Sequence, residues 1–226
     1  MIYRKHKIKH TALLPLIGTS IILVLALSSA CQSLNKRAPL SMKSVISPAD
    51  IYESKEDRSR VINYQINLKN IYTNVRSRYK PNQLDFFLVS GICFSNMQVN
   101  RSYDTYLSLN TKSLKNFLDT KTTFDQRASV IFNKYTKPLL KIAAEEREIL
   151  EDSKVAGLMI NTRWKVKKTS GNLSLTLFEQ IVLVTKKEQV DHYMEGAITD
   201  QELLDQSTLI AINEGENPHI INLHLE

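Results

Sequence analysis

Histidine and cysteine side chains are the groups from which this sequence would build a metal site or a catalytic centre. Beyond the basic N-terminal stretch the histidines are His192, His219 and His224. His219 and His224 are five residues apart, which places them on opposite faces of a strand and prevents local chelation of one ion. The chain also lacks a His-Glu-x-x-His, Cys-x-x-Cys or Gly-x-Ser-x-Gly motif and a glycine-rich phosphate loop. We therefore predict no metal site and no cofactor, and we identify no catalytic residue.

Cys31 stands at the end of a segment that has the three parts of a secretory signal. Residues 11–27 carry no charge and are followed by Ser28, Ser29 and Ala30. The basic part that precedes them comprises Arg4, Lys5, Lys7 and Lys9. An uncharged apolar helix partitions into a bilayer while its basic flank stays on the cytoplasmic side. The small residues leave the backbone accessible to a peptidase.

This layout resembles that of bacterial lipoprotein precursors, whose signal ends in a lipobox of Leu, two small residues and Cys. The resemblance covers residues 1–31, although Leu27 stands four residues before Cys31 instead of the usual three. It implies cleavage after Ala30 and lipid attachment through the thiol of Cys31. It also implies that the domain lies outside the cytoplasm, lipid-anchored to the bacterial cell membrane or outer membrane.

Two other interpretations of the N-terminal segment remain open. Residues 11–30 are twenty uncharged residues, which is just long enough to span a bilayer as an uncleaved anchor. Ordinary signal cleavage after Ala30 would instead leave a free thiol on Cys31. The cysteine directly after the small residues favours the lipoprotein.

Cys93 is the second of the two cysteines. With Cys31 committed to lipid, no intramolecular disulfide is available. Cys93 lies in an apolar run beside Ile92 and Phe94, with no basic neighbour to stabilise a thiolate. We predict a buried core residue and not a nucleophile.

The formal net charge of +7 invites a nucleic-acid interpretation, since clustered Lys and Arg bind phosphates. Residues 1–30 hold four basic residues and no acid, which leaves 26 basic against 23 acidic residues, or +3. The stretch after Lys187 contains carboxylates and no Lys or Arg. Arg163, Lys165 and Lys167 alternate with Trp164, which would therefore point away from them and could not stack on a base that they hold. We predict no nucleic-acid partner.

Residues 31–57 combine Ser, Pro39, Pro48, Lys and Asn without a sustained hydrophobic period. This composition predicts a lipidated N-terminus followed by a flexible tether. Lys36, Arg37 and Lys43 would contribute roughly 1 kcal/mol each if they rested on anionic lipid. A solvated linker explains the same residues equally well.

Helical periodicity is clearest in residues 58–79, where apolar side chains recur every three or four positions. They are Val61, Tyr64, Leu68, Ile71, Val75 and Tyr79. A longer helical region over 125–152 must be interrupted at Pro138, which lacks the N–H. Its run 145–148 is predicted to be a solvated charged face. Two short helices are expected, one over 111–118 and one over 200–206, where Thr199 and Glu202 form a capping box.

Strand patterns occupy much of the remaining chain. Residues 155–168 and 173–186 predict a hairpin around the turn 169–172. Residues 84–94 are apolar on both alternations, which favours a central strand covered on both faces. A half-buried strand over 103–109 would follow a polar connection at 95–102. Short strands are also expected at 208–212 and 220–225.

Helices interleaved with strands and short turns predict the α+β class, with an antiparallel or mixed sheet packed with amphipathic helices. The expected organisation is a signal peptide over 1–30, the lipidated tether over 31–57 and a single domain over 58–226. A domain of this length buries a substantial core.

The leading functional expectation is an envelope-anchored lipoprotein that acts as a structural, assembly or protein-binding component. Its partners would be the membrane, through the lipid on Cys31, and an unidentified protein. One alternative is a lipid-anchored module that binds a small ligand or peptide. The other is an envelope hydrolase whose residues are dispersed in the sequence.

Overall fold

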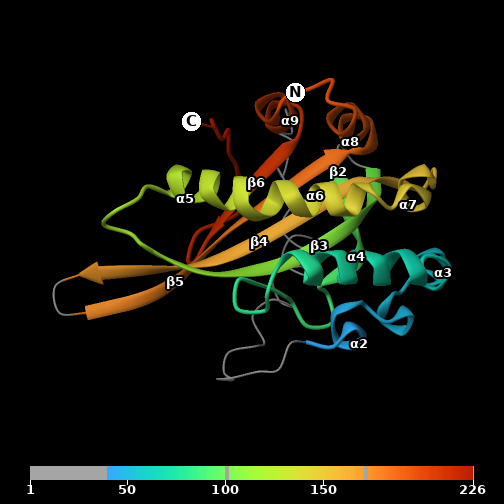
Figure 1. Ribbon diagram of the computed structural model, residues 1–226, viewed down its shortest axis with the longest axis horizontal. Coiled ribbons are helices and arrows are strands. Elements are labelled where there is room, and N and C mark those ends of the chain that lie inside the picture. Colours follow the sequence, from blue (N-terminus) through green and yellow to red (C-terminus); the bar gives the residue numbers. More distant parts are fainter. Residues whose placement is uncertain (1–39, 100–101, 171–172, 226) are drawn as a thin grey trace, which may run out of the picture. The chain divides into compact units, whose positions relative to one another are not determined.

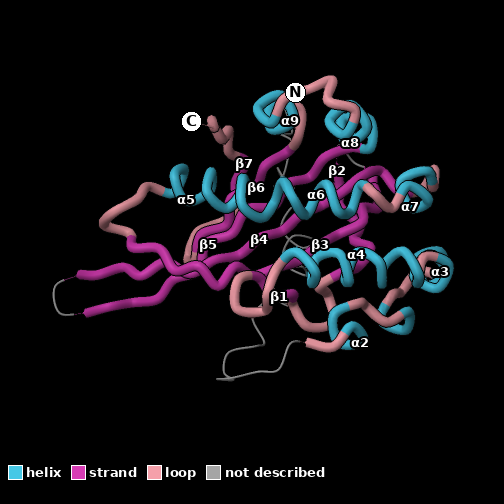
Figure 2. The backbone as a smooth tube through the Cα atoms, viewed as in Figure 1, coloured by secondary structure: helices cyan, strands magenta, loops and turns pink. Residues whose placement is uncertain are grey.

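Seven strands form one mixed sheet in the computed structural model, which describes residues 40–99, 102–170 and 173–225. The strands are β1 (Leu84–Phe86), β2 (Ile92–Val99), β3 (Ser102–Leu118), β4 (Val155–Ser170), β5 (Leu173–Lys186), β6 (Thr208–Asn213) and β7 (His219–Ile220). Their order is β1-β3-β4-β5-β6-β7, and β2 also pairs with β3 (Figure 2). All of these pairs are antiparallel except β3 with β4.

The parallel pair β3–β4 requires a crossover connection, and this connection supplies a row of helices. They are α5 (Phe124–Ile131), a π-helical turn (Phe132–Thr136), α6 (Lys137–Ala144) and α7 (Arg147–Glu151). The other helical elements are α2 (Met42–Val45), a 3-10 turn (Ala49–Ile51), α3 (Lys55–Asn63), α4 (Gln65–Arg78), α8 (Lys187–Met194) and α9 (Asp200–Asp205). Buried side chains from these helices pack with side chains from the sheet in the main core. Figure 1 shows α4, α5 and α6 lying over the sheet.

The predicted α+β class with a mixed sheet and amphipathic helices is confirmed. A second apolar cluster lies on the other face of the sheet. Within the described chain its members come from strands or their ends: Tyr106, Met159, Val182 and Val184, with Met97, Ala156, Ile210 and Ile212 packed against them.

The helical stripe predicted over 58–79 is confirmed, but it runs along two consecutive helices. Tyr64 leaves the helical conformation, with φ −97° and ψ 20°, between α3 and α4. Val61, Leu68 and Ile71 are all buried in the main core, where they replace water contacts by packing. The apolar stripe therefore stays buried although the helix is interrupted at Tyr64.

Pro138 interrupts the long helical region, as predicted, through a π-helical turn that immediately precedes α6. A proline cannot donate to the carbonyl four residues before it, which here belongs to Lys134. The Tyr79 hydroxyl donates to that carbonyl oxygen at 2.7 Å. The contact compensates the missing backbone bond and ties the end of α4 to the crossover helices.

The hairpin predicted over 155–186 is confirmed. β4 and β5 pair from Gly157↔Lys186 to Ser170↔Leu173. The capping box at α9 is confirmed as well, since Thr199 Oγ1 accepts from the Glu202 backbone N–H and Glu202 accepts from the Thr199 N–H.

Residues 111–118 were expected to form a short helix, and this prediction is wrong because they continue β3. Their backbone pairs with β1 on one side and with β4 on the other. A register shift between Lys112 and Asn116 is accommodated within the strand. Two neighbouring strands therefore outweigh the local helical preference.

Residues 84–94 were expected to form one central strand, but β1 and β2 are two pieces at an edge of the sheet. The chain leaves the sheet between them, at Val89 with a positive φ of 64°. Hydrogen bonds from Phe87 N to Asn110 O and from Asn110 N to Gly91 O hold the ends of this loop. Part of the two-sided apolar pattern thus belongs to a loop.

Three smaller differences concern local boundaries. β2 continues through most of the expected polar connection, because its backbone pairs with β3 as far as Val99↔Ser102. Helix α8 was not predicted, although its Val190 enters the main core. The last strand, β7, contains only His219 and Ile220.

Residues 40–57 differ from the flexible tether expected for 31–57. Val45 is fully buried in the core, and Ile46 forms an isolated parallel bridge with Ile92. The Tyr72 hydroxyl donates to the Leu40 carbonyl at 2.7 Å. The folded domain therefore includes residues from Leu40 onward, since apolar side chains without a sustained period still find places in the core.

Candidate functional site

The far end of the β4–β5 hairpin is the most distinctive surface feature of the domain. β3 pairs with β4 only as far as Leu118↔Lys167, and β6 pairs with β5 only as far as Asn213↔Glu179. We call residues 165–170 of β4 with residues 173–178 of β5 the arm. Its outer part is a two-stranded ribbon that projects beyond the helices (Figure 1).

A buried ionic joint holds the root of the arm. Glu179 on β5 accepts hydrogen bonds from Arg127 Nε at 2.8 Å, from Arg127 Nη2 at 2.6 Å and from Trp164 Nε1 at 2.9 Å. The Arg127 side chain on α5 is only 4% exposed and that of Glu179 is 13% exposed. Bidentate pairing fixes both groups in orientation as well as in distance. The joint therefore ties the first helix of the crossover to the hairpin.

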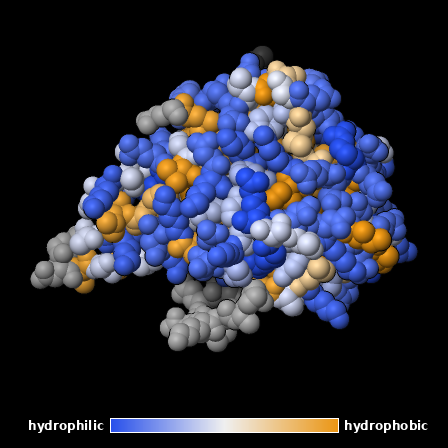
Figure 3. Space-filling view, viewed as in Figure 1, coloured by the Kyte–Doolittle hydropathy of each residue, from blue (hydrophilic) through white to orange (hydrophobic). Residues whose placement is uncertain are grey.

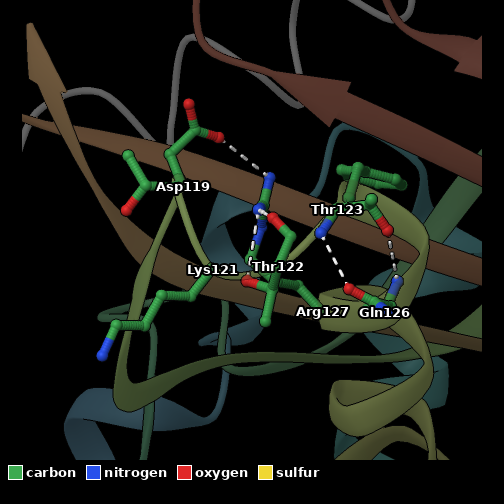
Figure 4. A pocket seen from close by; sticks show the side chains of 8 residues that line it. Asp119, Lys121, Thr122, Thr123, Gln126 and Arg127 are labelled. Atoms are coloured by element: carbon green, nitrogen blue, oxygen red, sulfur yellow. Dashed lines mark hydrogen bonds and ion pairs between the residues drawn. The ribbon is translucent and has the colours of Figure 1, made fainter.

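A shallow pocket of about 360 Å³ lies beside this joint, where the chain passes from β3 to α5. Figure 4 shows Asp119 directed toward Arg127, and their closest atoms are 3.6 Å apart. Thr123 and Gln126 form a reciprocal capping box at the start of α5. Arg127 Nη1 also donates to the Thr122 carbonyl. These polar groups bond to one another and hold the start of α5 beside the end of β3.

The root of the arm also carries a cation over an aromatic ring. Arg163 Cζ lies 4.0 Å from the centroid of the Phe178 ring, a contact between side chains on the same sheet face. Burial lowers the pKa of Arg163 from its ordinary value, and the nearby carboxylate of Glu214 opposes this shift. The guanidinium stays charged at neutral pH.

Cys93 lies in β2 and is buried, as predicted. Burial raises the pKa of its thiol, while a hydrogen bond with Ser95, whose Oγ is 3.4 Å away, acts in the opposite direction. A thiol held protonated and away from solvent is a poor nucleophile.

The histidines are spread over different parts of the described fold. His192 lies on α8 and His219 on β7, and both are exposed. His224 follows β7 and is exposed too. Within residues 40–99, 102–170 and 173–225, no group of three or more His, Cys, Asp or Glu side chains is arranged to hold a metal ion.

The charged run 145–148 does not form a uniformly solvated face. Glu146 is buried and accepts a hydrogen bond from Asn67 Nδ2 at 2.9 Å. This contact joins α4 to the segment between α6 and α7. The expectation holds for the exposed Glu145 and Glu148 but is wrong for Glu146.

The predicted cleavage position Ala30 and the predicted lipid-bearing Cys31 both lie outside the described residues. No helix in the described part of the chain has both the length and the apolar composition needed to cross a membrane.

Sequence reasoning missed the joint at the root of the arm. The signal that could have found it is Glu179, which follows the same alternation as the inward-facing Ile181 and Leu183. A carboxylate on the apolar side of a strand requires a partner.

No protein-family model matches the chain, and no curated protein or solved structure matches it either.

Proposed function

We propose that this protein is an envelope lipoprotein, anchored through a lipid on Cys31, that acts as a non-enzymatic binding or assembly component. The observation that carries the proposal is the N-terminal pattern of basic stretch, uncharged stretch, small residues and Cys31. The position of Leu40 in the folded domain agrees with this function. Nine residue steps from Cys31 to Leu40 span at most about 30 Å, so the lipid would hold the domain close to the membrane.

The protein-binding part of the proposal is supported by an acidic face on α8 and α9, at the opposite end of β5 from the arm. Its exposed carboxylates are Glu188, Glu195, Glu202 and Asp205. No Lys or Arg follows Lys187 in the sequence, and Lys137 and Arg147, which contact these helices from the crossover, are paired with Asp200 and Asp191. Anionic lipid repels such a surface, whereas a basic protein surface is attracted to it. We therefore expect the acidic face to be turned away from the bilayer and toward a basic partner.

Replacing Cys31 with Ser is expected to abolish lipid attachment, because acylation requires the thiol. Intact-mass analysis of the unsubstituted protein should show the polypeptide 31–226 plus a lipid increment, and the protein should enter the detergent phase on phase separation. The Cys31→Ser variant should lack the increment and accumulate as an unprocessed precursor or a secreted form. Cys93→Ser is the matched control and should retain the lipid. A membrane-bound protein that keeps Met1 and carries no lipid on Cys31 would refute the proposal.

Reversing charge on the acidic face is expected to weaken partner binding severalfold at low salt, since electrostatic complementarity governs encounter. The double variant Glu195→Lys/Asp205→Lys should show a reduced yield of its crosslinked product in intact membranes. Glu53→Lys reverses an exposed carboxylate beside α3 and should leave the yield unchanged. Equal yields from both variants would argue against a role for the acidic face.

A further inference from the structure

Two leucines near the end of the arm are exposed on one face of the ribbon. Leu173 is 71% exposed and Leu175 is 56% exposed, and they are two residues apart on the same strand. Exposed apolar residues that stand alone are ordinary, but adjacent ones on a projecting ribbon form a patch. In Figure 3, hydrophobic residues reach the part of the molecule where the arm projects.

The charge of the same segment has one sign. Between Asp152 and Glu179 the sequence contains basic residues and no acid. Three of them lie on the arm and are exposed: Lys165, Lys167 and Lys168. Lys168 pairs in register with Leu175, so a cation lies directly across the ribbon from an exposed leucine. Lys168 shares the face of the two leucines, whereas Lys165 and Lys167, which pair with Phe178 and Thr176, lie on the other face of the ribbon. The arm is therefore basic on both faces and apolar on one over the same short length.

A lipid bilayer provides complementary layers for both kinds of side chain. Transfer of leucine side chains from water to the acyl boundary lowers the free energy. Lysine side chains have alkyl stems long enough to place the ammonium group among the phosphates. The attraction of each such lysine to an anionic surface raises the binding constant about fivefold. A nucleic acid would meet the charges but would leave the leucines in water.

We propose that the arm binds the surface of an anionic phospholipid bilayer, with Leu173 and Leu175 entering the acyl boundary and Lys165, Lys167 and Lys168 lying among the headgroups. This contact goes beyond the proposed function, because it does not depend on a lipid on Cys31. It is formed at the opposite end of β5 from the acidic face.

The test places an environment-sensitive fluorophore on single cysteines in the full chain. The background is Cys31→Ser, which leaves Cys93 as the single native cysteine, and Cys93 is buried and should stay unlabelled. Leu173→Cys reports on the arm and Leu175→Cys is a second position there. Ile220→Cys on β7 is the matched control, since Ile220 is also 71% exposed. A label inside the bilayer is quenched by spin-labelled lipid, so the reading is local to the labelled residue.

With vesicles of phosphatidylcholine and phosphatidylglycerol, we expect blue-shifted, quenched emission at both arm positions and unchanged emission at Ile220→Cys. With phosphatidylcholine alone, the response at the arm should largely disappear. Adding Lys167→Gln and Lys168→Gln should lower the insertion equilibrium constant about fivefold for each substitution. Circular dichroism of the labelled variants checks that the fold is kept.

Three results would overturn the inference. One is a response at Ile220→Cys as large as that at the arm. Another is an arm response that neither phosphatidylglycerol nor the lysine substitutions alter. The third is an arm label that becomes shielded from water in the absence of vesicles. This shielding could follow the addition of a DNA oligonucleotide or an increase in the protein concentration. Because the background lacks the Cys31 thiol, none of these results depends on whether Cys31 is lipidated.

Discussion

Replacing Glu179 with Leu is expected to lower the free energy of unfolding by about 3–5 kcal/mol, because it leaves the buried guanidinium of Arg127 without its bidentate partner. The same change removes the acceptor for Trp164 Nε1. An unpaired buried charge costs more than the pair itself contributes, since its desolvation is no longer compensated. Urea denaturation followed by tryptophan fluorescence measures the change, and Trp164 is the single tryptophan of the chain.

Two further variants separate the buried charge from packing at the joint. The double variant Arg127→Met/Glu179→Leu removes both charges and should recover much of the lost stability. Asp191→Ala breaks the exposed pair with Arg147, whose closest atoms are 2.5 Å apart, and should cost no more than about 1 kcal/mol. The interpretation fails if the single Glu179 variant is no less stable than the Asp191 variant.

Replacing Gly157 with Ala is expected to destabilise the domain by about 3 kcal/mol or more, because an added Cβ would lie 2.0 Å from the backbone oxygen of Thr185. The Lys186 Cα would lie 2.8 Å away. These are backbone atoms of the paired strand β5, so they cannot rotate away as a side chain does. Relief requires β4 and β5 to separate where their pairing begins.

Gly196→Ala is the matched control, because it adds the same methyl group in open space. Apart from the two sequence neighbours of Gly196, no atom of the described residues lies within 4 Å of a Cβ placed there, and its φ is +75°. Its cost should be only that of the left-handed backbone, about 1–2 kcal/mol. Thermal unfolding should therefore show a clearly larger fall in Tm for Gly157→Ala. Similar Tm values for the two variants would contradict the expected clash.

Local sequence patterns determined the elements whose stabilising contacts lie nearby in the chain. The apolar stripe of residues 58–79 identified the buried side of α3 and α4, because helical spacing alone places those side chains together. The β4–β5 hairpin followed from two strand patterns around a short turn. Thr199 and Glu202 identified the start of α9, since both capping bonds join residues three apart.

The tertiary structure decided what depends on partners distant in sequence. Residues 111–118 became strand because β1 and β4 pair with them, and residues 84–94 became an edge because their loop leaves the sheet. Arg127 pairs with Glu179, which lies 52 positions away in the sequence, so no local pattern could show the pair. The lysines of the arm were visible in the sequence, but the exposure of Leu173 and Leu175 was not. That exposure arises because β3 and β6 stop pairing before the hairpin ends, and the length of a neighbouring strand is a property of the assembled sheet.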